Sequence, residues 1–354
     1  MAAEPTDPER ILLVRPSALG DVCRTVPVLA ALRRRWPDAR IDWLVQDGFA
    51  QAIAAHPALT EAVPFPRRRL SPIGRPDRMA AAARWALGLR RRRYDLVLDC
   101  QGLLRSGLIT WATGAPRRVG DAAAREGAAR CYTERVDVPA DAHTVDRMMA
   151  LAEAAGAHDA SADPDMRLHL AESDAAWAER TLAGVGPLVV LAPTARWMAK
   201  RWPQDRFADL AERLMRRTDA TIAVVGGVDE GEQCPALLAL ARRERRVLDL
   251  VGGTTIGRLM AVVARGDLVI ANDSAALHMA VGFDRPLVAL FGPTLTHLVG
   301  PYGREADVLQ HATPGHTAAH KDPANAAMMR TISVDEVEAA ALGRLSRTAA
   351  RSPS

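Results

Sequence analysis

The sequence predicts an α/β protein of two Rossmann-like halves, each a parallel sheet covered by helices, which face one another across a central cleft. Short apolar runs alternate with helix-length amphipathic segments along the chain, a pattern typical of parallel sheets with both faces covered. Residues 15–21 and 272–278 each put a small-residue turn and a carboxylate directly after a buried strand. Ligands bind at the carboxyl ends of such strands, so two ends of this kind predict two lobes around one site.

The expected strands are the continuous apolar runs. In the first half they are residues 11–14, 41–45, 62–65 and 96–98, and in the second half 188–192, 221–225, 247–251, 268–271 and 287–291. Apolar residues at helical spacing predict the connecting helices, among them 26–35, 207–217 and 256–264. Right-handed crossovers then make each half Rossmann-like. A last helix is expected over 334–345, where Ser333 and Glu336 form a capping-box pattern.

The connection between the halves is expected at residues 184–187, where two glycines and a proline precede a new strand. The predicted domains are therefore 10–183 and 187–345, and a chain of 354 residues is long enough for two cores. Residues 346–354 are expected to form a disordered tail.

Composition excludes several classes of protein. Hydrophobic residues make up 49% and charged residues 25%, which indicates a globular rather than a disordered chain. No apolar stretch approaches the roughly 20 residues that span a bilayer, and the polar start lacks the apolar core of a signal peptide. A cytoplasmic location is therefore expected. The four cysteines are far apart and form no CxxC pair, which argues against a zinc site or a disulfide framework.

Positive charge is concentrated in one stretch, although the formal net charge is only +4. Residues 67–93 hold ten arginines and one acidic residue, Asp77. Such a block suits an acidic partner: a phosphorylated glycolipid, an anionic membrane surface or nucleic acid. A solvated helix face is the alternative. The few nearby aromatic residues form no stacking platform, so no nucleic-acid partner is expected.

Asp21 is the first candidate for chemistry. It follows the turn at 17–20, directly after the first expected strand, and lies where a helix begins. A carboxylate there gains roughly 0.3–1 kcal/mol from the helix dipole, which would account for it without catalysis. Its place at the carboxyl end of a strand favours the other interpretation, a general base that faces the cleft.

Five segments carry a family likeness: residues 15–45, 99–106, 200–203 (Lys-Arg-Trp-Pro), 272–278 and 291–294 (Phe-Gly-Pro-Thr). Together they resemble the glycosyltransferase family 9 heptosyltransferases, which build the inner core of lipopolysaccharide. The likeness covers most of residues 10–340 in consistent order. Residues 41–51 look closest to the members that attach the first heptose to Kdo on lipid A.

The resemblance implies a GT-B fold, with the acceptor bound by residues 10–183 and the nucleotide sugar by residues 187–345. It implies inverting transfer of a heptose, or a related sugar, from ADP-heptose to an anionic acceptor of the Kdo–lipid A type, with no cofactor beyond this donor. Asp21 matches the family's catalytic base. A carboxylate positioned to take the proton of a sugar hydroxyl is worth ~10²–10⁴ in rate.

Positive charge and free N–H groups are expected to hold the departing diphosphate. Lys200 is the candidate for the charge, because only Lys200 and Lys321 are lysines among 46 Lys and Arg residues. A lysine among arginines indicates that a compact ammonium is needed. A helix that starts near Ser274 would offer N–H groups, although Ala275 and Ala276 stand where the family has glycine, often followed by proline.

The resemblance also implies side chains that hold the rest of the donor: Thr194, Glu230, Thr254, Asp273 and His278. Asp273 would bind sugar hydroxyls, and Glu230, or the equally placed Asp229, would bind those of the ribose. Thr254 would lie near the adenine, with helix capping as the alternative. His278 would orient the turn, or is a structural histidine.

The acceptor contacts that the resemblance implies are Ser17, Arg67, Arg68, Arg69, Gln101 and Arg125. Arginine forks suit the carboxylate of Kdo and the phosphates of lipid A, and such an acceptor implies peripheral association with the inner face of the inner membrane. No metal is expected. Residues 163–165 have the DxD spacing of metal-dependent glycosyltransferases, but they lie in a polar linker rather than after a buried strand.

Two other functions stay open. A nucleotide-sugar epimerase of the same architecture would need no acceptor site, and the arginine block and Asp21 argue against it. A non-catalytic nucleotide-binding descendant is compatible with Ala275 and Ala276. Inverting glycosyl transfer is the function that the residues favour.

Overall fold

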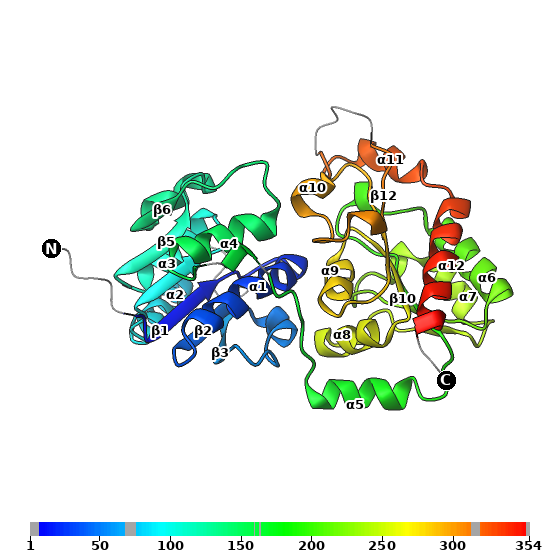
Figure 1. The fold of residues 1–354 in the computed structure, drawn as a ribbon, viewed down its shortest axis with the longest axis horizontal. Coiled ribbons are helices and arrows are strands. Elements are labelled where there is room, and N and C mark those ends of the chain that lie inside the picture. Colours follow the sequence, from blue (N-terminus) through cyan, green and yellow to red (C-terminus); the bar gives the residue numbers. More distant parts are fainter. Residues whose placement is uncertain (1–6, 68–75, 159, 163, 313–318, 352–354) are drawn as a thin grey trace. The chain divides into compact units, whose positions relative to one another are not determined.

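The computed structural model divides into two compact units, Met1–His169 and Leu170–Ser354 (Figure 1). It describes residues 7–67, 76–158, 160–162, 164–312 and 319–351. Each unit holds one six-stranded sheet in which every strand pairing is parallel. The predicted pair of Rossmann-like α/β halves is therefore confirmed.

The division between the units falls earlier than the predicted connection at 184–187. Helix α5 (Glu172–Thr181) packs against α8 (Ile256–Arg265) and belongs to the second unit. Asp174 of α5 approaches Gly257 of α8 so closely that a Cβ at this glycine would lie 2.0 Å from Oδ2 of Asp174. The glycines and proline of the predicted connection therefore form a turn inside the second unit.

The first sheet has the strand order β3-β2-β1-β4-β5-β6. Its strands are β1 (Arg10–Val14), β2 (Arg40–Gln46), β3 (Glu61–Phe65), β4 (Leu96–Asp99), β5 (Arg117–Asp121) and β6 (Glu134–Val136). The order reverses between β1 and β4, which pair directly. In open α/β sheets the ligand crevice lies at the carboxyl ends of the two strands beside such a reversal.

The second sheet repeats this topology, with the order β12-β11-β10-β7-β8-β9. Its strands are β7 (Leu188–Ala192), β8 (Thr221–Val224), β9 (Val247–Asp249), β10 (Leu268–Asn272), β11 (Leu287–Leu290) and β12 (Val308–Leu309). Here the reversal lies between β7 and β10. Each sheet therefore has one such reversal, at whose carboxyl edge a ligand is expected to bind. We call this place the crevice position of the sheet.

Strands β5, β6 and β12 are not predicted by the sequence, because none of them is a continuous apolar run. β5 reads Arg-Arg-Val-Gly-Asp and β6 reads Glu-Arg-Val. Arg117 of β5 donates two hydrogen bonds, of 2.8 and 2.9 Å, to the carboxylate of Glu134 on β6. Charge pairing between neighbouring strands thus replaces the apolar pattern on which the prediction depends.

Helices cover both sheets. In the first unit they are α1 (Leu19–Arg35), α2 (Pro76–Arg90), α3 (Leu104–Ala112) and α4 (Thr144–Ala154). In the second unit the helices besides α5 and α8 are α6 (Gln204–Arg217), α7 (Pro235–Ala241), α9 (Ala275–Gly282), α10 (Thr296–Val299), α11 (Ala326–Arg330) and α12 (Val334–Arg351). No helix in the described ranges is long and apolar enough to cross a membrane.

The capping box predicted before the last helix is present: Glu336 N donates to Ser333 Oγ at 3.2 Å, and Ser333 N donates to Glu336 Oε2 at 2.8 Å. The helix then continues six residues past its predicted end, to Arg351. The disorder predicted from residue 346 is therefore wrong as far as residue 351. No proline lies between Val334 and Pro353, so no proline stops the helix at Leu345.

Candidate active-site residues on the two units

The first crevice position is built by the loop from β1 into α1. Asp21 is the third residue of α1, and its Oδ2 accepts a hydrogen bond of 3.0 Å from Ala18 N at the start of the helix. Asp21 therefore does interact with the start of the helix, the structural role that could account for it without catalysis. This interaction leaves the other oxygen, Oδ1, for other partners.

Two buried arginines hold that second oxygen. The Arg15 guanidinium lies 3.1 Å from Asp21 Oδ1, and the Arg24 guanidinium is hydrogen-bonded to the same atom. Burial acts to raise the pKa of Asp21, but the charges of Arg15 and Arg24 and the Ala18 N–H outweigh it and hold the pKa well below its ordinary value. The side chain is 25% exposed. Asp21 is thus an ionised carboxylate that a ligand can reach.

The loop after β4 lies beside this carboxylate. Ser17 N donates a 3.3 Å hydrogen bond to Gln101 Oε1, which joins the β1 and β4 loops. Asp99, the last residue of β4, accepts from Gln101 N at 2.9 Å and from Tyr132 Oη at 2.7 Å. Burial raises the pKa of Asp99, although these hydrogen bonds oppose the shift. The structure therefore brings the predicted residues Ser17 and Gln101 together, with Asp99 as their support.

Of the remaining predicted acceptor residues, the structure describes Arg125 and Arg67. Arg125 N donates to Gly102 O at 3.0 Å, so this exposed arginine lies beside the turn that contains Gln101. Arg67 is exposed just beyond β3, two strands from β1. Arg68 and Arg69 lie outside the described residues.

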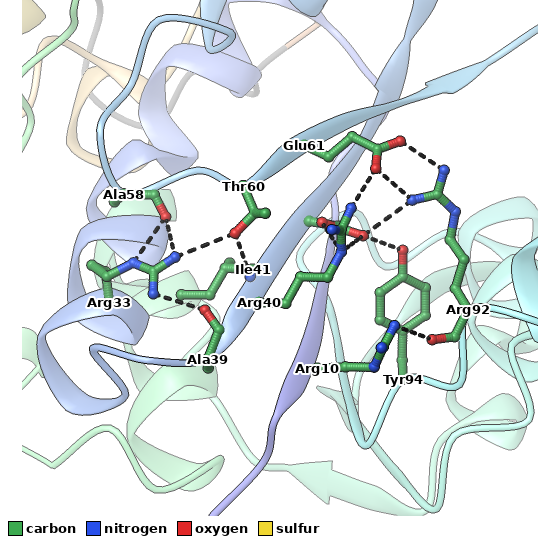
Figure 2. Close-up of polar contacts among 11 residues, drawn as sticks. Arg10, Arg33, Ala39, Arg40, Ile41, Ala58, Thr60, Glu61, Arg92 and Tyr94 are labelled. Carbon is green, nitrogen blue, oxygen red and sulfur yellow. Dashed lines mark hydrogen bonds and ion pairs between the residues drawn. The ribbon is translucent and has the colours of Figure 1, made fainter.

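Arg92, from the predicted basic block, has a structural role instead (Figure 2). Its guanidinium donates to Glu61 Oε1 at 2.7 Å and to Asp42 Oδ2 at 3.2 Å. Tyr94 Oη donates to the same Asp42 oxygen at 2.8 Å. Because Asp42 is fully buried on β2, these partners satisfy one oxygen of a carboxylate that would otherwise be more costly to bury. This part of the block ties β2 and β3 together and is not free to bind an acidic partner.

The second crevice position contains the predicted lysine. Lys200 Nζ lies 2.6 Å from Asp273 Oδ2, with only 15% and 9% of the two side chains exposed. Lys200 ends a short 3₁₀ helix in the loop after β7, and Asp273 directly follows β10. Asn272 ties the end of β10 to the loop that carries Lys200, because its side-chain amide donates to Pro193 O at 2.7 Å and accepts from Trp202 N at 3.1 Å.

Helix α9 begins directly after Asp273, with Ser274 as its N-cap residue in an extended conformation. The first N–H groups of a helix, here those of Ala275 and Ala276, have no acceptor within the helix. The two alanines therefore form a regular helix start in place of the family's glycine. His278 is buried within α9.

The nucleotide-side residues gather at the carboxyl ends of β7, β8 and β9. Thr194 Oγ1 donates a 2.6 Å hydrogen bond to Glu230 Oε2, which also accepts from Gly227 N at 2.7 Å. Glu230 Oε1 has no partner in the described part of the chain, so it is available to a ligand. Half-buried Thr254 directly precedes Thr255, and Thr255 is the residue that caps α8, accepting from Arg258 N at 3.3 Å.

Sequence reasoning missed Arg15, Arg24, Asp99 and Asn272 as site-building residues. The signal for Asp99 and Asn272 is the one that marks Asp21 and Asp273, a polar side chain at or just after the end of a buried strand. For Arg24 the signal is weaker: an arginine one turn after a candidate carboxylate on an otherwise apolar helix face.

Comparisons with known proteins decide the family. The model of glycosyltransferase family 9 (heptosyltransferase) matches residues 83–327. A Pseudomonas aeruginosa protein named lipopolysaccharide heptosyltransferase 1 is 32% identical over 303 residues, which cover 83% of this chain and 82% of the relative. The chain belongs to glycosyltransferase family 9. Another family 9 relative, lipopolysaccharide heptosyltransferase 2 of Salmonella typhimurium, is 27% identical over 89% of this chain and 92% of its own length.

Solved structures of family 9 enzymes share the fold. Escherichia coli ADP-heptose lipopolysaccharide heptosyltransferase II aligns with a TM-score of 0.79 at 23% identity and covers 96% of this chain and 99% of its own. E. coli heptosyltransferase WaaC with ADP-2-deoxy-2-fluoro heptose aligns with a TM-score of 0.72 at 24% identity and covers 93% and 98%. The predicted family and the GT-B fold class are thereby confirmed.

Proposed function

We propose that this family 9 member is a heptosyltransferase of lipopolysaccharide core synthesis that moves heptose from ADP-heptose to an anionic acceptor of the Kdo–lipid A type. The observation that supports this proposal most is the pair of oppositely charged groups, one at each crevice position. An accessible anion, Asp21, lies on the first unit, and a partly buried cation, Lys200, lies on the second. Inverting transfer needs both, one to take a proton and one to receive a leaving diphosphate.

Asp21 acts as the general base. The acceptor hydroxyl oxygen attacks the anomeric carbon of the heptose, the bond from that carbon to the phosphate oxygen breaks, and the hydroxyl proton passes to the carboxylate. The arginine partners make Asp21 a weak base. A weak base is sufficient when the proton leaves late, because the hydroxyl becomes strongly acidic as its oxygen bonds to carbon. Attack from the face opposite the diphosphate inverts the anomeric centre.

Lys200 receives the leaving group. A diphosphate at the start of α9 would meet the free N–H groups of Ala275 and Ala276 and compete with Asp273 for the ammonium. Release of Asp273 from Lys200 would allow its carboxylate to bind hydroxyls of the transferred sugar. The released ammonium then neutralises charge as it develops on ADP, and no metal ion is required.

The nucleoside is assigned to the neighbouring strand ends. Glu230 Oε1 accepts hydrogen bonds from the ribose hydroxyls while Oε2 stays anchored by Thr194 and Gly227. Thr254 borders the adenine, and His278 supports the α9 turn from inside the helix. On the first unit, Ser17, Gln101 and Arg125, together with Arg67, Arg68 and Arg69, hold the carboxylate and phosphates of the acceptor.

The two alternative functions are less well supported. The family model describes glycosyl transfer, which favours a transferase over an epimerase. A non-catalytic descendant would have no reason to keep Asp21 ionised by two buried arginines, since Arg15 and Arg24 are costly to bury.

The test is a transfer assay with purified protein, ADP-heptose and Kdo-bearing lipid A, followed by mass spectrometry of the product and NMR of the new anomeric centre. We expect one heptose added per acceptor with inverted configuration, and unchanged turnover in the presence of a chelator. Hydrolysis or epimerisation of the donor without any transfer would contradict the proposal. Activity that a chelator abolishes would contradict its metal-independent mechanism.

A further inference from the structure

Helices α2 and α3 expose an apolar surface on the first unit. Among the described residues, seven large hydrophobic side chains are exposed, and five of them lie on these two helices. On α3 the spacing of Leu104, Leu108 and Trp111 puts them on one face, and on α2 the exposed residues are Met79 and Leu87. Their exposed fractions run from 41% to 61%. We call these five side chains the α2–α3 stripe.

The two helices cover the same face of the first sheet, so their outer faces form one surface. Leu89 of α2 and Ile109 of α3 pack into one core cluster with Val14 and Val97 of the sheet, and α2 contacts α3. The α2–α3 stripe points away from that core. Apolar patches exposed on soluble proteins generally mark an interaction site.

Exposed arginines surround the α2–α3 stripe: Arg84, Arg90, Arg91, Arg93 and Arg105. None of these five forms an ion pair or a side-chain hydrogen bond within the described parts of the chain. This contrasts with the arginines of the β2–β3 side, which carboxylates and carbonyl groups hold in a network (Figure 2). The cations beside the α2–α3 stripe are therefore available to a negatively charged partner.

A depression of about 510 Å³ lies at the C-terminal ends of α2 and α3 and is lined by Leu87, Arg90, Arg91 and Arg93. The one carboxylate in its lining, that of Asp95, already accepts hydrogen bonds from the backbone N–H groups of residues 9 and 10, at 3.0 and 2.9 Å. The depression thus combines an apolar wall with three unneutralised guanidinium groups. Anionic lipid headgroups attached to acyl chains present the complementary combination.

We infer that the α2–α3 stripe and its surrounding arginines dock the first unit on an anionic phospholipid membrane. The inference builds on the proposed function, whose acceptor is a lipid. Both helices begin at the carboxyl edge of the first sheet, α3 at Leu104 and α2 at Pro76, and both end at its opposite edge, where the depression lies. A membrane bound along these helices would therefore meet the acceptor edge of the sheet at the N-terminal ends of the helices. A second copy of the chain is the poorer occupant, because a symmetric contact would bring two arginine clusters together.

The experiment is flotation of the full-length protein with vesicles of phosphatidylcholine, with and without about 30% phosphatidylglycerol. We expect binding to the anionic vesicles that weakens with salt. The double variant Leu108→Ser/Trp111→Ser should bind at least about tenfold more weakly. The triple variant Arg84→Gln/Arg91→Gln/Arg93→Gln should lose about 100-fold, since each arginine near an anionic surface is worth about fivefold.

The matched control is Arg216→Gln/Arg242→Gln/Arg245→Gln, which removes the same charge from exposed positions on the second unit and should leave binding within about threefold of wild type. All variants should keep wild-type transfer to a water-soluble Kdo-bearing acceptor, because none touches the proposed site. Failure of wild type to bind, equal binding by every variant, or concentration-dependent dimerisation that the stripe variant abolishes would overturn the inference. Vesicle binding without any transfer would count against the proposed function alone.

Discussion

Substitution of Asp21 by Asn tests the chemistry and the electrostatics of the first unit together. The amide keeps the shape of the carboxylate but lacks the charge that pairs with Arg15 and Arg24. It also has little basicity, so it cannot take the acceptor proton. Turnover should fall by at least ~100-fold, which is the lower end of the contribution of a general base.

The same substitution should also destabilise the first unit by an amount that the burial sets. Arg15 and Arg24 would be left as two buried cations without their shared carboxylate. Breaking a fully buried ion pair costs about 3–5 kcal/mol. Because a quarter of the Asp21 side chain is exposed, we expect the lower limit, about 3 kcal/mol. Denaturant unfolding of the purified variant measures this loss.

The pH dependence separates the two effects. The folded-state pKa of Asp21 is held below its ordinary value of 3.8, so its stabilising contribution is complete above that value and is lost as the pH falls through the folded-state pKa. The difference in unfolding free energy between wild type and Asp21→Asn should therefore be constant between about pH 5 and 8 and shrink in stronger acid. No acid limb from Asp21 should appear in kcat/KM above about pH 5.

The assay follows ADP release and labelled product at a temperature at which the variant is fully folded. Asp141→Asn, an exposed aspartate on the same unit, is the control and should retain both activity and stability. Near-normal turnover in Asp21→Asn would remove Asp21 from the mechanism. A stability equal to that of wild type would show that the arginine pair does not depend on this carboxylate.

Three further predictions concern the second unit. Lys200→Ala should raise the KM for ADP-heptose and lower kcat, and Lys200→Arg should restore little, because a planar fork does not replace a compact ammonium beside Asp273; unchanged donor kinetics would exclude it from diphosphate binding. Thr194→Val removes one anchor of Glu230 and should weaken ADP binding in calorimetry by about tenfold, that is about 1–1.5 kcal/mol. Asn272→Ala leaves Trp202 N and Pro193 O buried without partners and should lower the free energy of unfolding by about 2–4 kcal/mol, which chemical denaturation would measure.

The sequence predicts the positions of the key charges well because strand ends are visible in it. A continuous apolar run marks a buried parallel strand, and the residue after it must lie at the carboxyl edge of the sheet. Asp21 and Asp273 follow this rule closely enough to be assigned to a site, whereas Lys200 is marked by composition, as one of only two lysines. The strand order that makes these ends adjacent is a property of right-handed crossovers and needs no side-chain detail.

Pairing between distant side chains is what the sequence does not reveal. Lys200 and Asp273 are separated by 73 positions, and Tyr132 supports Asp99 from 33 positions away. Likewise, the apolar pattern misses β5, because Arg117 is neutralised by Glu134 rather than turned toward solvent. Composition counts these charges but cannot tell which of them the fold pairs with each other.

That distinction decides how the arginines of this chain should be interpreted. In the basic block, Arg92 is held by Glu61 and buried Asp42 and contributes to the fold, whereas Arg91 and Arg93, its immediate neighbours, are exposed beside an apolar surface. At each of the two crevice positions a charged side chain is likewise held by a group of opposite charge, a carboxylate by arginines on the first unit and a lysine by a carboxylate on the second. Asp21 is kept anionic by buried cations and Lys200 is paired with Asp273, so each charge is in place before a substrate arrives.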